Sequence, residues 1–211
     1  MKHLVIIGAG GMGKEIFYTA KRSIGYGTEF DIKGFIDDNI HALDEFTGYP
    51  PVLDTINGYK LKDDDVFTCS MGNVQTKRKV CEIIKSRGGK FQTLIDCQAQ
   101  IRDNVKIGEG TIVDAYAMVG TDAVIGENCL IQSFSNVAHD CKVGDYTRVD
   151  VRSLMVGGVV VGNNVTIHTN AIINHRVTIE DDATVGALSF VIRNVKAGTT
   201  VCGNPAIRLK Y

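Results

Sequence analysis

The chain has 211 residues, of which 44% are hydrophobic and 22% charged, and its formal net charge is −1. This length and composition are typical of a folded protein with one large or two small domains, and the charge gives no electrostatic reason to expect nucleic acid or an anionic membrane as a partner. The N-terminal apolar run in MKHLVIIGAG is too short for a secretion signal, and no segment reaches the length of a membrane span. We therefore expect a cytoplasmic protein with six reduced cysteines.

Residues 1–94 contain apolar segments that alternate with amphipathic ones. The segments HLVII (3–7), DIKGFID (31–37) and DVFTCS (65–70) predict strands, and residues 13–23 and 76–87 predict helices. Strands and helices in this alternating order favour a small parallel sheet covered by helices. We expect residues 1–94 to form a small Rossmann-like α/β domain.

A glycine-rich segment, GAGGMG, joins the first predicted strand to the first predicted helix. Gly8, Gly10 and Gly13 fit the pattern G-x-G-x-x-G, which allows a tight turn and presents backbone amides to a phosphate. Asp37 and Asp38 follow the next strand, where a carboxylate can accept hydrogen bonds from a ribose. The segment predicts a nucleotide-type site, and the alternative is a tight turn beside a solvated acidic corner.

Two more specific nucleotide sites do not fit this segment. A P-loop needs Ser or Thr after its lysine to hold Mg²⁺, and Glu15 stands there. A dinucleotide-dependent dehydrogenase needs two βαβαβ halves, whereas residues 1–94 supply one. One half is expected to hold a single nucleotide.

From Ile95 onward, an aliphatic residue recurs at every sixth position. Seventeen consecutive positions, ending at Val191, are Ile, Val or Met, and the residue four places after each is always Ala, Val, Thr, Cys or Ser. A short fixed period of this kind is typical of a parallel β-helix, whose coils stack because none can bury its own apolar face. The sequence therefore predicts a second domain over residues 95–211, which includes a C-terminal tail.

Motifs along the whole chain resemble one family. IIGAGGMGKEI, GFIDD, MGN, hexads that contain HD, and a GNPA tail are similar to the hexapeptide-repeat acetyltransferases, which include sialic-acid O-acetyltransferases and bacillosamine-pathway nucleotide-sugar N-acetyltransferases. The resemblance implies a left-handed parallel β-helix with three hexads per coil, acetyl-CoA as co-substrate, a nucleotide-sugar or sugar acceptor, and a homotrimer. It also implies that the acceptor is held by the glycine-rich segment and the acidic pair: Gly8, Gly10, Gly11, Met12, Asp37 and Asp38, with Met12 where the family commonly has His.

His139 and Asp140 interrupt the aliphatic repeat in HDCKVG. An amine that attacks a thioester must lose a proton, and a neutral histidine can accept it near pH 7. A neighbouring carboxylate can fix the imidazole tautomer and stabilise its charged form. In the resembling family this His is the proposed base and the acid its partner, so we expect these roles for His139 and Asp140. The alternative is an exposed corner histidine beside a turn-forming Asp.

The resemblance also implies where acetyl-CoA binds. Its pantetheine arm would pass Gly157, Gly158, Gly186 and Ala187, and its adenine end would lie near Gly203 and Pro205. Arg148 stands where the family often has His, and its guanidinium can donate to the thioester carbonyl or to a phosphate. The alternative is that these glycines only form corners.

His175 follows His139 by thirty-six residues, which would place it two coils away in the same column, about 9–10 Å along the axis. Histidines in this relation also occur in γ-class carbonic anhydrases, where a third ligand completes a zinc site, but Glu180 stands at that third position. Catalytic zinc takes three protein ligands, so no metal is expected. His175 is expected to be an exposed corner residue or a wall of the acceptor pocket.

These features together predict an acyltransferase that moves acetyl from acetyl-CoA to the amino group of a nucleotide-linked sugar by direct attack. Three alternatives stay open: O-acetylation of a sialic-acid-type sugar, nucleotide binding by a solenoid without catalysis, and a zinc hydratase.

Overall fold

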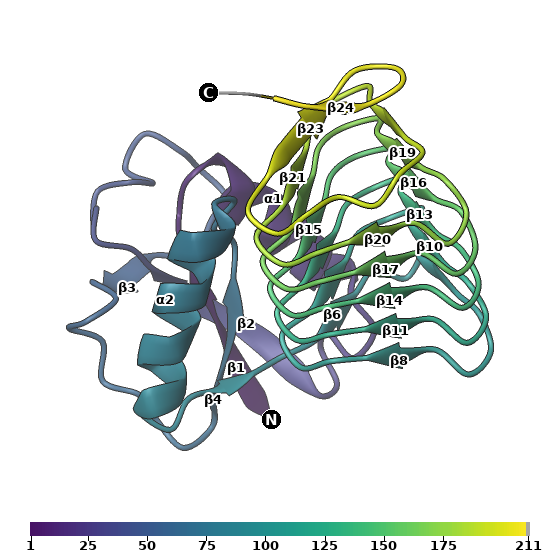
Figure 1. The fold of residues 1–211 in the computed structure, drawn as a ribbon. Helices are drawn as coiled ribbons and strands as arrows, with labels where there is room; N and C mark the ends of the chain where they lie inside the picture. The colour runs from purple at the N-terminus through teal and green to yellow at the C-terminus, as the bar shows by residue number, and fades with distance from the viewer. Residues whose placement is uncertain (210–211) are drawn as a thin grey trace. The chain divides into compact units, whose positions relative to one another are not determined.

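The computed structural model describes residues 1–209, and the chain divides into two compact units, Met1–Cys97 and Gln98–Tyr211. The predicted fold class, an N-terminal α/β domain followed by a parallel β-solenoid of hexapeptide repeats, is confirmed (Figure 1). Within residues 1–209, no helix is both long enough and apolar enough to cross a bilayer.

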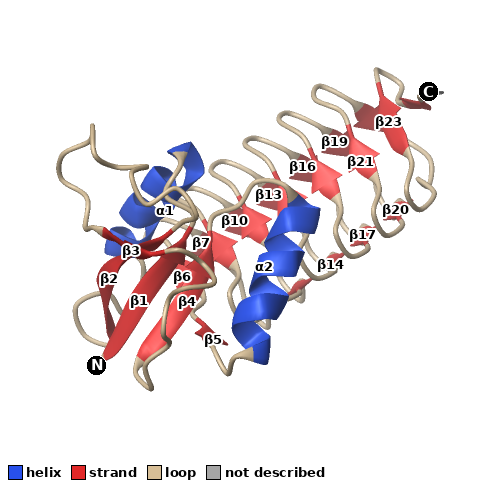
Figure 2. Cartoon of the chain, turned by 90° about the vertical axis from the view of Figure 1, so that its left-hand side faces the viewer, coloured by secondary structure: helices blue, strands red, loops and turns tan. Residues whose placement is uncertain are grey.

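The first unit contains a five-stranded parallel sheet with the strand order β3-β2-β1-β4-β5. The predicted strands and helices are confirmed with small changes at their ends, whereas both edge strands were not predicted. The sheet consists of β1 (Lys2–Ile7), β2 (Phe30–Ile36), β3 (Val52–Asp54), β4 (Asp65–Cys69) and β5 (Lys90–Phe91). Helices α1 (Gly11–Arg22) and α2 (Val74–Ser86) connect β1 to β2 and β4 to β5 (Figure 2).

The core of the first unit lies between the sheet and these helices. Central strand β1 contributes four consecutive residues, Leu4 to Ile7, whose exposed fraction is 0%. Helix α1 faces the core with the predicted Ile16, Phe17 and Ala20. A continuous apolar run is typical of a strand that is covered on both faces.

The strand order places a binding crevice at the carboxyl ends of β1 and β4. The chain proceeds from β1 to β2 on one side and continues through β4 and β5 on the other, so the direction of winding reverses between β1 and β4. In open α/β sheets, ligands bind at this switch point, outside the carboxyl ends of the strands. The glycine-rich segment after β1 and the loop after β4, residues 70–73, both begin there.

The second unit is a solenoid whose three faces are parallel sheets. Two-residue strands recur every six residues from β6 (Leu94–Ile95), at the end of the first unit, to β22 (Phe190–Val191), and paired residues such as Met118 and Asn136 are eighteen apart, so each coil contains three hexads. The first face holds β7 (Gln100–Ile101), β10 (Met118–Val119), β13 (Asn136–Val137), β16 (Leu154–Met155), β19 (Ile172–Ile173) and β22 (Phe190–Val191). The second holds β8 (Lys106–Ile107), β11 (Val124–Ile125), β14 (Lys142–Val143), β17 (Val160–Val161) and β20 (Thr178–Ile179). The third includes β9 (Ile112–Val113), β12 (Leu130–Ile131), β15 (Arg148–Val149), β18 (Thr166–Ile167), β21 (Thr184–Val185), β23 (Thr200–Cys202) and the antiparallel β24 (Ile207–Arg208).

The predicted aliphatic residues fill the interior of the solenoid. From Val113 to Val191, every hexad's aliphatic residue is buried, with exposed fractions of 0–3%. The small residues four places later are also buried from Thr111 onward, which leaves room for the aliphatic side chains of the adjacent strands.

Many corners carry a glycine because successive coils approach closely there. An ideal Cβ on Gly108 would lie 2.5 Å from the backbone of Gly126, and one on Gly144 would lie 2.6 Å from that of Gly162. This spacing explains why glycine so often follows the aliphatic residue in the repeat.

Candidate functional site

His139 and Asp140 lie at the corner between β13 and β14. The imidazole Nδ1 donates a hydrogen bond to Asp140 Oδ2 over 2.7 Å, and both side chains are more than 60% exposed. Asp140 has a φ of +59°, a left-handed conformation that Asp tolerates better than most residues. Since Nδ1 carries the proton that is donated to the carboxylate, Nε2 is free to accept one.

The His139 ring rests on Gly157, the equivalent residue of the next coil. An ideal Cβ on Gly157 would lie 2.4 Å from both Nε2 and Cε1 of the ring, too close for any side chain. Gly158 follows with a φ of +72°, and its missing Cβ leaves space for the stem of Arg176. The absence of side chains at these two glycines leaves room for the imidazole and for Arg176 at this corner. That they also border a cofactor arm stays a prediction from the sequence.

Backbone amides along this corner lack acceptors. Among residues 1–209, no acceptor bonds the N–H of Gly157, of His175 or of Arg193, which occupy the same position in successive coils. At the next corner along the chain, by contrast, the equivalent amides of Asp145 and Asn163 donate to Asn163 Oδ1 and Asp181 Oδ1, each over 2.8 Å. The corner of His139 therefore presents a row of donors, about 4.8 Å apart, to a bound molecule.

His175 lies on this corner with an exposed side chain, two coils beyond His139. Glu180 accepts hydrogen bonds from Lys196 Nζ (2.8 Å) and from the Ala197 amide (3.1 Å), and these bonds, the lysine first, lower its pKa. In the described part of the chain, no group of three or more His, Cys, Asp and Glu side chains is placed to hold a metal ion.

Arg148 is paired with a buried carboxylate. Its Nε and Nη2 both donate to Asp150, which is 2% exposed, and the Nη2 bond measures 2.8 Å. His168 Nδ1 contacts the same carboxylate at 3.1 Å from the next coil. The sequence did not predict this cluster: Arg148 and Asp150 are two residues apart, but His168 joins them only when an eighteen-residue coil closes.

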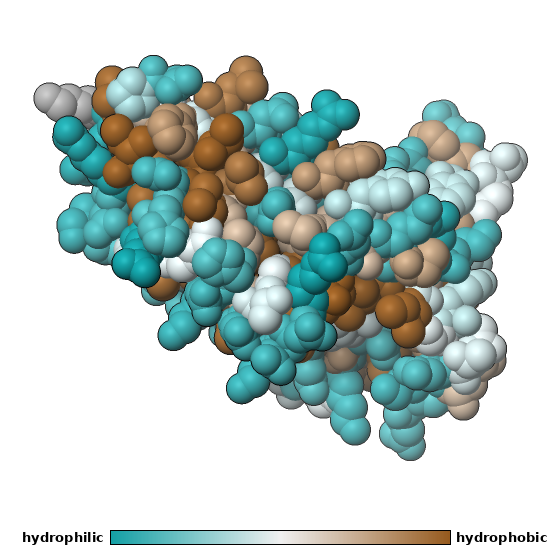
Figure 3. Space-filling model, turned by 90° about the vertical axis from the view of Figure 1, so that its right-hand side faces the viewer, coloured by the Kyte–Doolittle hydropathy of each residue, from teal (hydrophilic) through white to brown (hydrophobic). Residues whose placement is uncertain are grey.

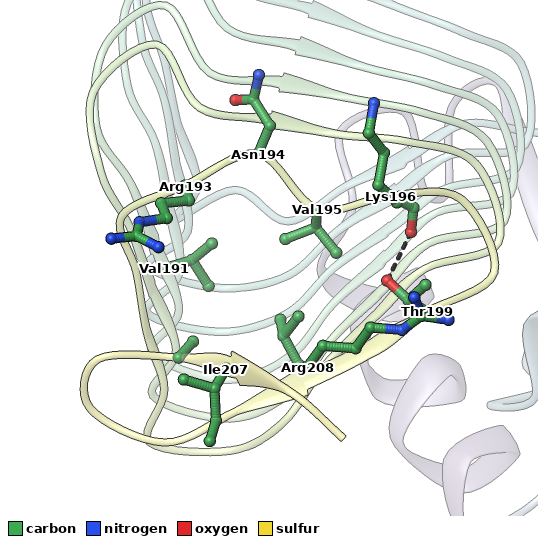
Figure 4. A pocket seen from close by; sticks show the side chains of 10 residues that line it. Val191, Arg193, Asn194, Val195, Lys196, Thr199, Ile207 and Arg208 are labelled. Atoms are coloured by element: carbon green, nitrogen blue, oxygen red, sulfur yellow. Dashed lines mark hydrogen bonds between the residues drawn. The ribbon is translucent and has the colours of Figure 1, made fainter. Parts of the chain in front are cut away.

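The C-terminal end of the solenoid contains a pocket of about 270 Å³ (Figure 4). Val191, Val195 and Val201 line it together with the cations Arg193, Lys196 and Arg208. The expected cofactor residues Gly203 and Pro205 precede β24 in an exposed loop, with a cis peptide bond between Asn204 and Pro205. Gly186 packs closely on this end, since an ideal Cβ would lie 2.7 Å from Cys202 Cβ, and Ala187 beside it is exposed.

In the first unit, the three glycines of the fingerprint have distinct physical roles. Gly8 turns the chain with a φ of +96°, and Gly13 allows α1 to pack on the loop, because an ideal Cβ would lie 2.1 Å from the Gly8 carbonyl oxygen. Gly10 and Gly11 face open space and are exposed, whereas Met12 is half-buried. The backbone of this loop is thus open to a ligand at the start of α1.

The acidic pair after β2 stabilises this crevice. Asp37 accepts hydrogen bonds from the amides of Ala9 (2.7 Å) and Asn39 (2.8 Å), and Asp38 accepts one from the Ile56 amide (3.2 Å). Each carboxylate oxygen can accept more than one hydrogen bond, so both groups keep capacity for a ligand.

Two family models match the two units. Residues 3–84 match the PglD N-terminal domain, and residues 122–150 and 158–193 match the bacterial transferase hexapeptide (six repeats).

Two curated relatives are similar to part of the chain. GDP-perosamine N-acetyltransferase of Escherichia coli O157:H7 is 30% identical over 144 residues, which cover 67% of this chain and 64% of that protein. UDP-N-acetylbacillosamine N-acetyltransferase of Bacillus subtilis (strain 168) is 29% identical over 119 residues, which cover 54% of this chain and 52% of that protein. The matched segments thus span less than two thirds of either relative.

A solved structure is similar over nearly the whole chain. The acetyltransferase domain of PglB from Neisseria gonorrhoeae FA1090, in complex with acetyl coenzyme A, superimposes with a TM-score of 0.88 at 28% identity and covers 99% of each chain. The order of the domains, their repeats and this overall likeness agree with the family resemblance predicted from the motifs. The chain belongs to the proteins in which a PglD N-terminal domain is followed by bacterial transferase hexapeptide repeats.

Proposed function

We propose that the protein transfers an acetyl group from acetyl-CoA to the amino group of a nucleotide-linked sugar. Both curated relatives are N-acetyltransferases whose names specify a nucleotide-linked sugar, and the PglB acetyltransferase domain binds acetyl coenzyme A. The observation that carries the proposal is the position of His139 Nε2, a free proton acceptor directly above Gly157, whose backbone amide has no acceptor among the described residues.

In the proposed reaction, His139 Nε2 accepts a proton from the sugar amine as its nitrogen attacks the thioester carbonyl. Asp140 stabilises the imidazolium that forms, and the Gly157 N–H donates to the negative oxygen of the tetrahedral intermediate. The carbon–sulfur bond then breaks, and the thiolate of CoA takes the proton back from His139. The products are an amide and free CoA, with no covalent bond to the protein.

The unpaired amides along the same corner support a position for the acyl donor. The pantetheine arm carries two amide groups, whose carbonyl oxygens can accept from the N–H groups of His175 and Arg193. Gly158, Gly186 and Ala187 are the proposed neighbours of this arm, and Gly203 and Pro205 those of the adenosine end. Arg148 is the proposed contact of the thioester carbonyl or of a phosphate of acetyl-CoA. Its ion pair with Asp150 limits the direction in which its guanidinium can donate.

The first unit is the proposed binding site of the sugar's nucleotide. The open backbone of Gly10 and Gly11 suits a close approach by phosphate or ribose, with Gly8, Met12, Asp37 and Asp38 around it. Since the sheet provides a single switch point, we expect one nucleotide to be bound.

We propose that the protein works as a homotrimer. Several large apolar side chains of the second unit are exposed, among them Leu188 at 73% and Ile172 at 40%, and Figure 3 shows apolar areas between polar ones on one face. Subunit contacts commonly cover such surface, and rotational symmetry closes the assembly.

Replacing His139 tests the catalytic proposal. The His139→Ala variant should reduce kcat about 100- to 10,000-fold in an assay of thiol release from acetyl-CoA with UDP-, GDP- and dTDP-linked amino sugars as acceptors. His41→Ala is the matched control, because His41 also pairs with a carboxylate, Asp44, at 2.7 Å and is exposed, but lies outside the proposed site.

Three results would count against the proposal. Near-normal turnover by a folded His139→Ala protein removes the base assignment. Product analysis that finds an ester instead of an amide would favour a sugar O-acetyltransferase. Thermal stabilisation by nucleotides without any release of CoA would favour a binding protein.

A further inference from the structure

The first face of the solenoid carries an asparagine within a row of apolar residues. Side chains that face outward follow one another in register from coil to coil, and the four that share the row of Asn136 between β10 and β22 are apolar: Met118, Leu154, Ile172 and Phe190. Asparagine is unfavourable in a strand, whereas an apolar side chain packs well against such neighbours. The presence of Asn136 in this row therefore needs an explanation beyond folding.

The side-chain amide of Asn136 forms no hydrogen bond within residues 1–209, and its two ends differ in exposure. The carbonyl oxygen Oδ1 is buried and has no partner there. The nitrogen Nδ2 also has none, but it reaches the surface. A buried carbonyl oxygen without a donor opposes folding. The side chain thus presents an N–H group to the outside at a cost in stability.

Asn136 lies on β13, the strand that leads to His139. Three residues, about 10 Å of extended chain, separate the two, and Val137 between them points into the solenoid with an exposed fraction of 0%. Because side chains of a strand alternate, Asn136 faces outward on the same coil as the imidazole. Two donors thus accompany the proposed base: the amide of Gly157 on the next coil, and Nδ2 of Asn136 on its own coil.

The two donors suit different reactants of the proposed reaction. The row of amides without acceptors begins at Gly157 and continues through His175 to Arg193, along the proposed path of the acyl donor. Asn136 belongs to the coil before this row, the coil of the histidine that accepts the proton of the amine. An amino sugar commonly has a hydroxyl group beside its amine, and the oxygen of that group can accept a hydrogen bond.

We propose that Asn136 is a substrate-binding residue whose Nδ2 donates a hydrogen bond to the hydroxyl oxygen next to the amine of the acceptor sugar. The inference rests on the proposed function and extends it, because it assigns recognition of the sugar ring to the solenoid, whereas the first unit is the proposed site of the nucleotide. It also assigns a specificity: an acceptor that lacks this hydroxyl loses the contact.

The variant Asn136→Leu separates substrate binding from folding. Leucine matches Leu154 of the next coil, and it removes both the N–H donor and the buried oxygen. In steady-state thiol release with the best acceptor among UDP-, GDP- and dTDP-linked amino sugars, KM for the acceptor should rise roughly 5- to 50-fold, while KM for acetyl-CoA stays the same. The melting temperature should equal or exceed that of the unmodified protein, because an unpaired buried oxygen is gone. Met118→Leu, one coil earlier in the same row, is the control and should change neither KM.

A second acceptor tests the assigned contact. An analogue of the same nucleotide-linked sugar, with hydrogen in place of the hydroxyl next to the amine, should react with the unmodified protein and with Asn136→Leu at nearly the same kcat/KM. If the two proteins differ as much with this analogue as with the complete acceptor, Asn136 does not contact that hydroxyl.

The outcomes are distinguishable from those that concern the proposed function. If the unmodified protein releases no CoA with any of these acceptors, the proposed function fails and this inference with it. If it does release CoA, and Asn136→Leu has an unchanged KM for the acceptor, the proposed function stands and only the role of Asn136 is wrong. An unchanged KM together with a lower melting temperature would assign Asn136 to the packing of the first face, and together with an altered mass in light scattering it would assign Asn136 to a contact between copies.

Discussion

The position of the His139 imidazole depends on the absence of a side chain at the equivalent residue of the next coil. Gly157 has no Cβ, and any Cβ there would overlap the ring at 2.4 Å from Nε2. The backbone of Gly157 lies outside the left-handed region, so an alanine could adopt its conformation without strain. The glycine is therefore required by the position of the base and not by the turn.

Gly157→Ala should thus impair the reaction through His139. We expect kcat to fall roughly 100-fold, because the added methyl group displaces the ring from its position against Gly157. The measurement is steady-state thiol release, together with the melting temperature as a control for folding.

A double variant tests whether Gly157→Ala lowers kcat through His139. In a protein that already carries His139→Ala, adding Gly157→Ala should reduce kcat little further, since the imidazole that the methyl group would displace is absent. Additive losses would instead mean that Gly157 acts independently of the histidine.

Individual residues were predictable from sequence where a local motif carries them. The pair of His139 and Asp140 is adjacent in the chain, so its contact follows from local geometry. The contact of His168 with Asp150 joins residues eighteen apart and depends on coil closure, and the bond from the Ala9 amide to Asp37 joins residues twenty-eight apart. Single-sequence patterns do not contain such distances.

Three elements of the first unit converge on one carboxylate. Asp65, at the start of β4, is 5% exposed and accepts hydrogen bonds from Lys33 Nζ on β2 (2.5 Å), from Tyr59 Oη (2.7 Å) and from the Lys62 amide (2.9 Å). Burial alone would raise the pKa of Asp65, but the hydrogen bonds, above all that from Lys33, reverse this and hold it below its ordinary value of 3.8. The charged form of Asp65 therefore stabilises the junction of these elements.

Asp65→Asn should destabilise the protein by about 2 to 4 kcal/mol, because it leaves Lys33 without its counter-charge. The pKa of the carboxyl group is lower in the folded than in the unfolded state, so its contribution is complete above pH 3.8 and is lost as the pH falls through the folded pKa. Urea unfolding at neutral pH and between about pH 2 and 4 measures both effects.

The pH dependence of stability in acid provides the sharper test. The stability of the unmodified protein should decline more steeply below pH 3.8 than that of Asp65→Asn. Parallel pH profiles for the two proteins would show that Asp65 does not titrate differently in the two states.

Among the helices and strands of the first unit, the longer ones could be predicted from the sequence and the shortest could not. Strands β1, β2 and β4 and both helices have enough residues to show apolar runs or helical periodicity. The edge strands β3 and β5 have three and two residues, and follow Pro51 and Gly89, where turn signals dominate. Pairing with a neighbouring strand defines them, and that is a property of the assembled sheet.

The whole solenoid was predictable because one rule repeats along it. Each coil adds eighteen residues and buries its apolar residues against the coils on both sides, so the architecture follows from the period alone. The ends depart from this rule because a terminal coil has a neighbour on one side only. Thus Ile131, in the interior, is 0% exposed, whereas Ile101, in the first coil of the second unit, is 37% exposed although it occupies the same position of its hexad.

Position along the solenoid should therefore determine the cost of removing an identical side chain. Ile131→Ala should reduce the free energy of unfolding by about 2 to 5 kcal/mol, because it leaves a cavity that the flanking coils cannot fill. Ile101→Ala should cost less than about 1 kcal/mol, since part of that side chain is already in contact with water. Urea unfolding, followed by circular dichroism, gives both values from the shift in midpoint. Equal costs would mean that the first coil is as tightly packed as the interior, and that the repeat does not weaken toward its end.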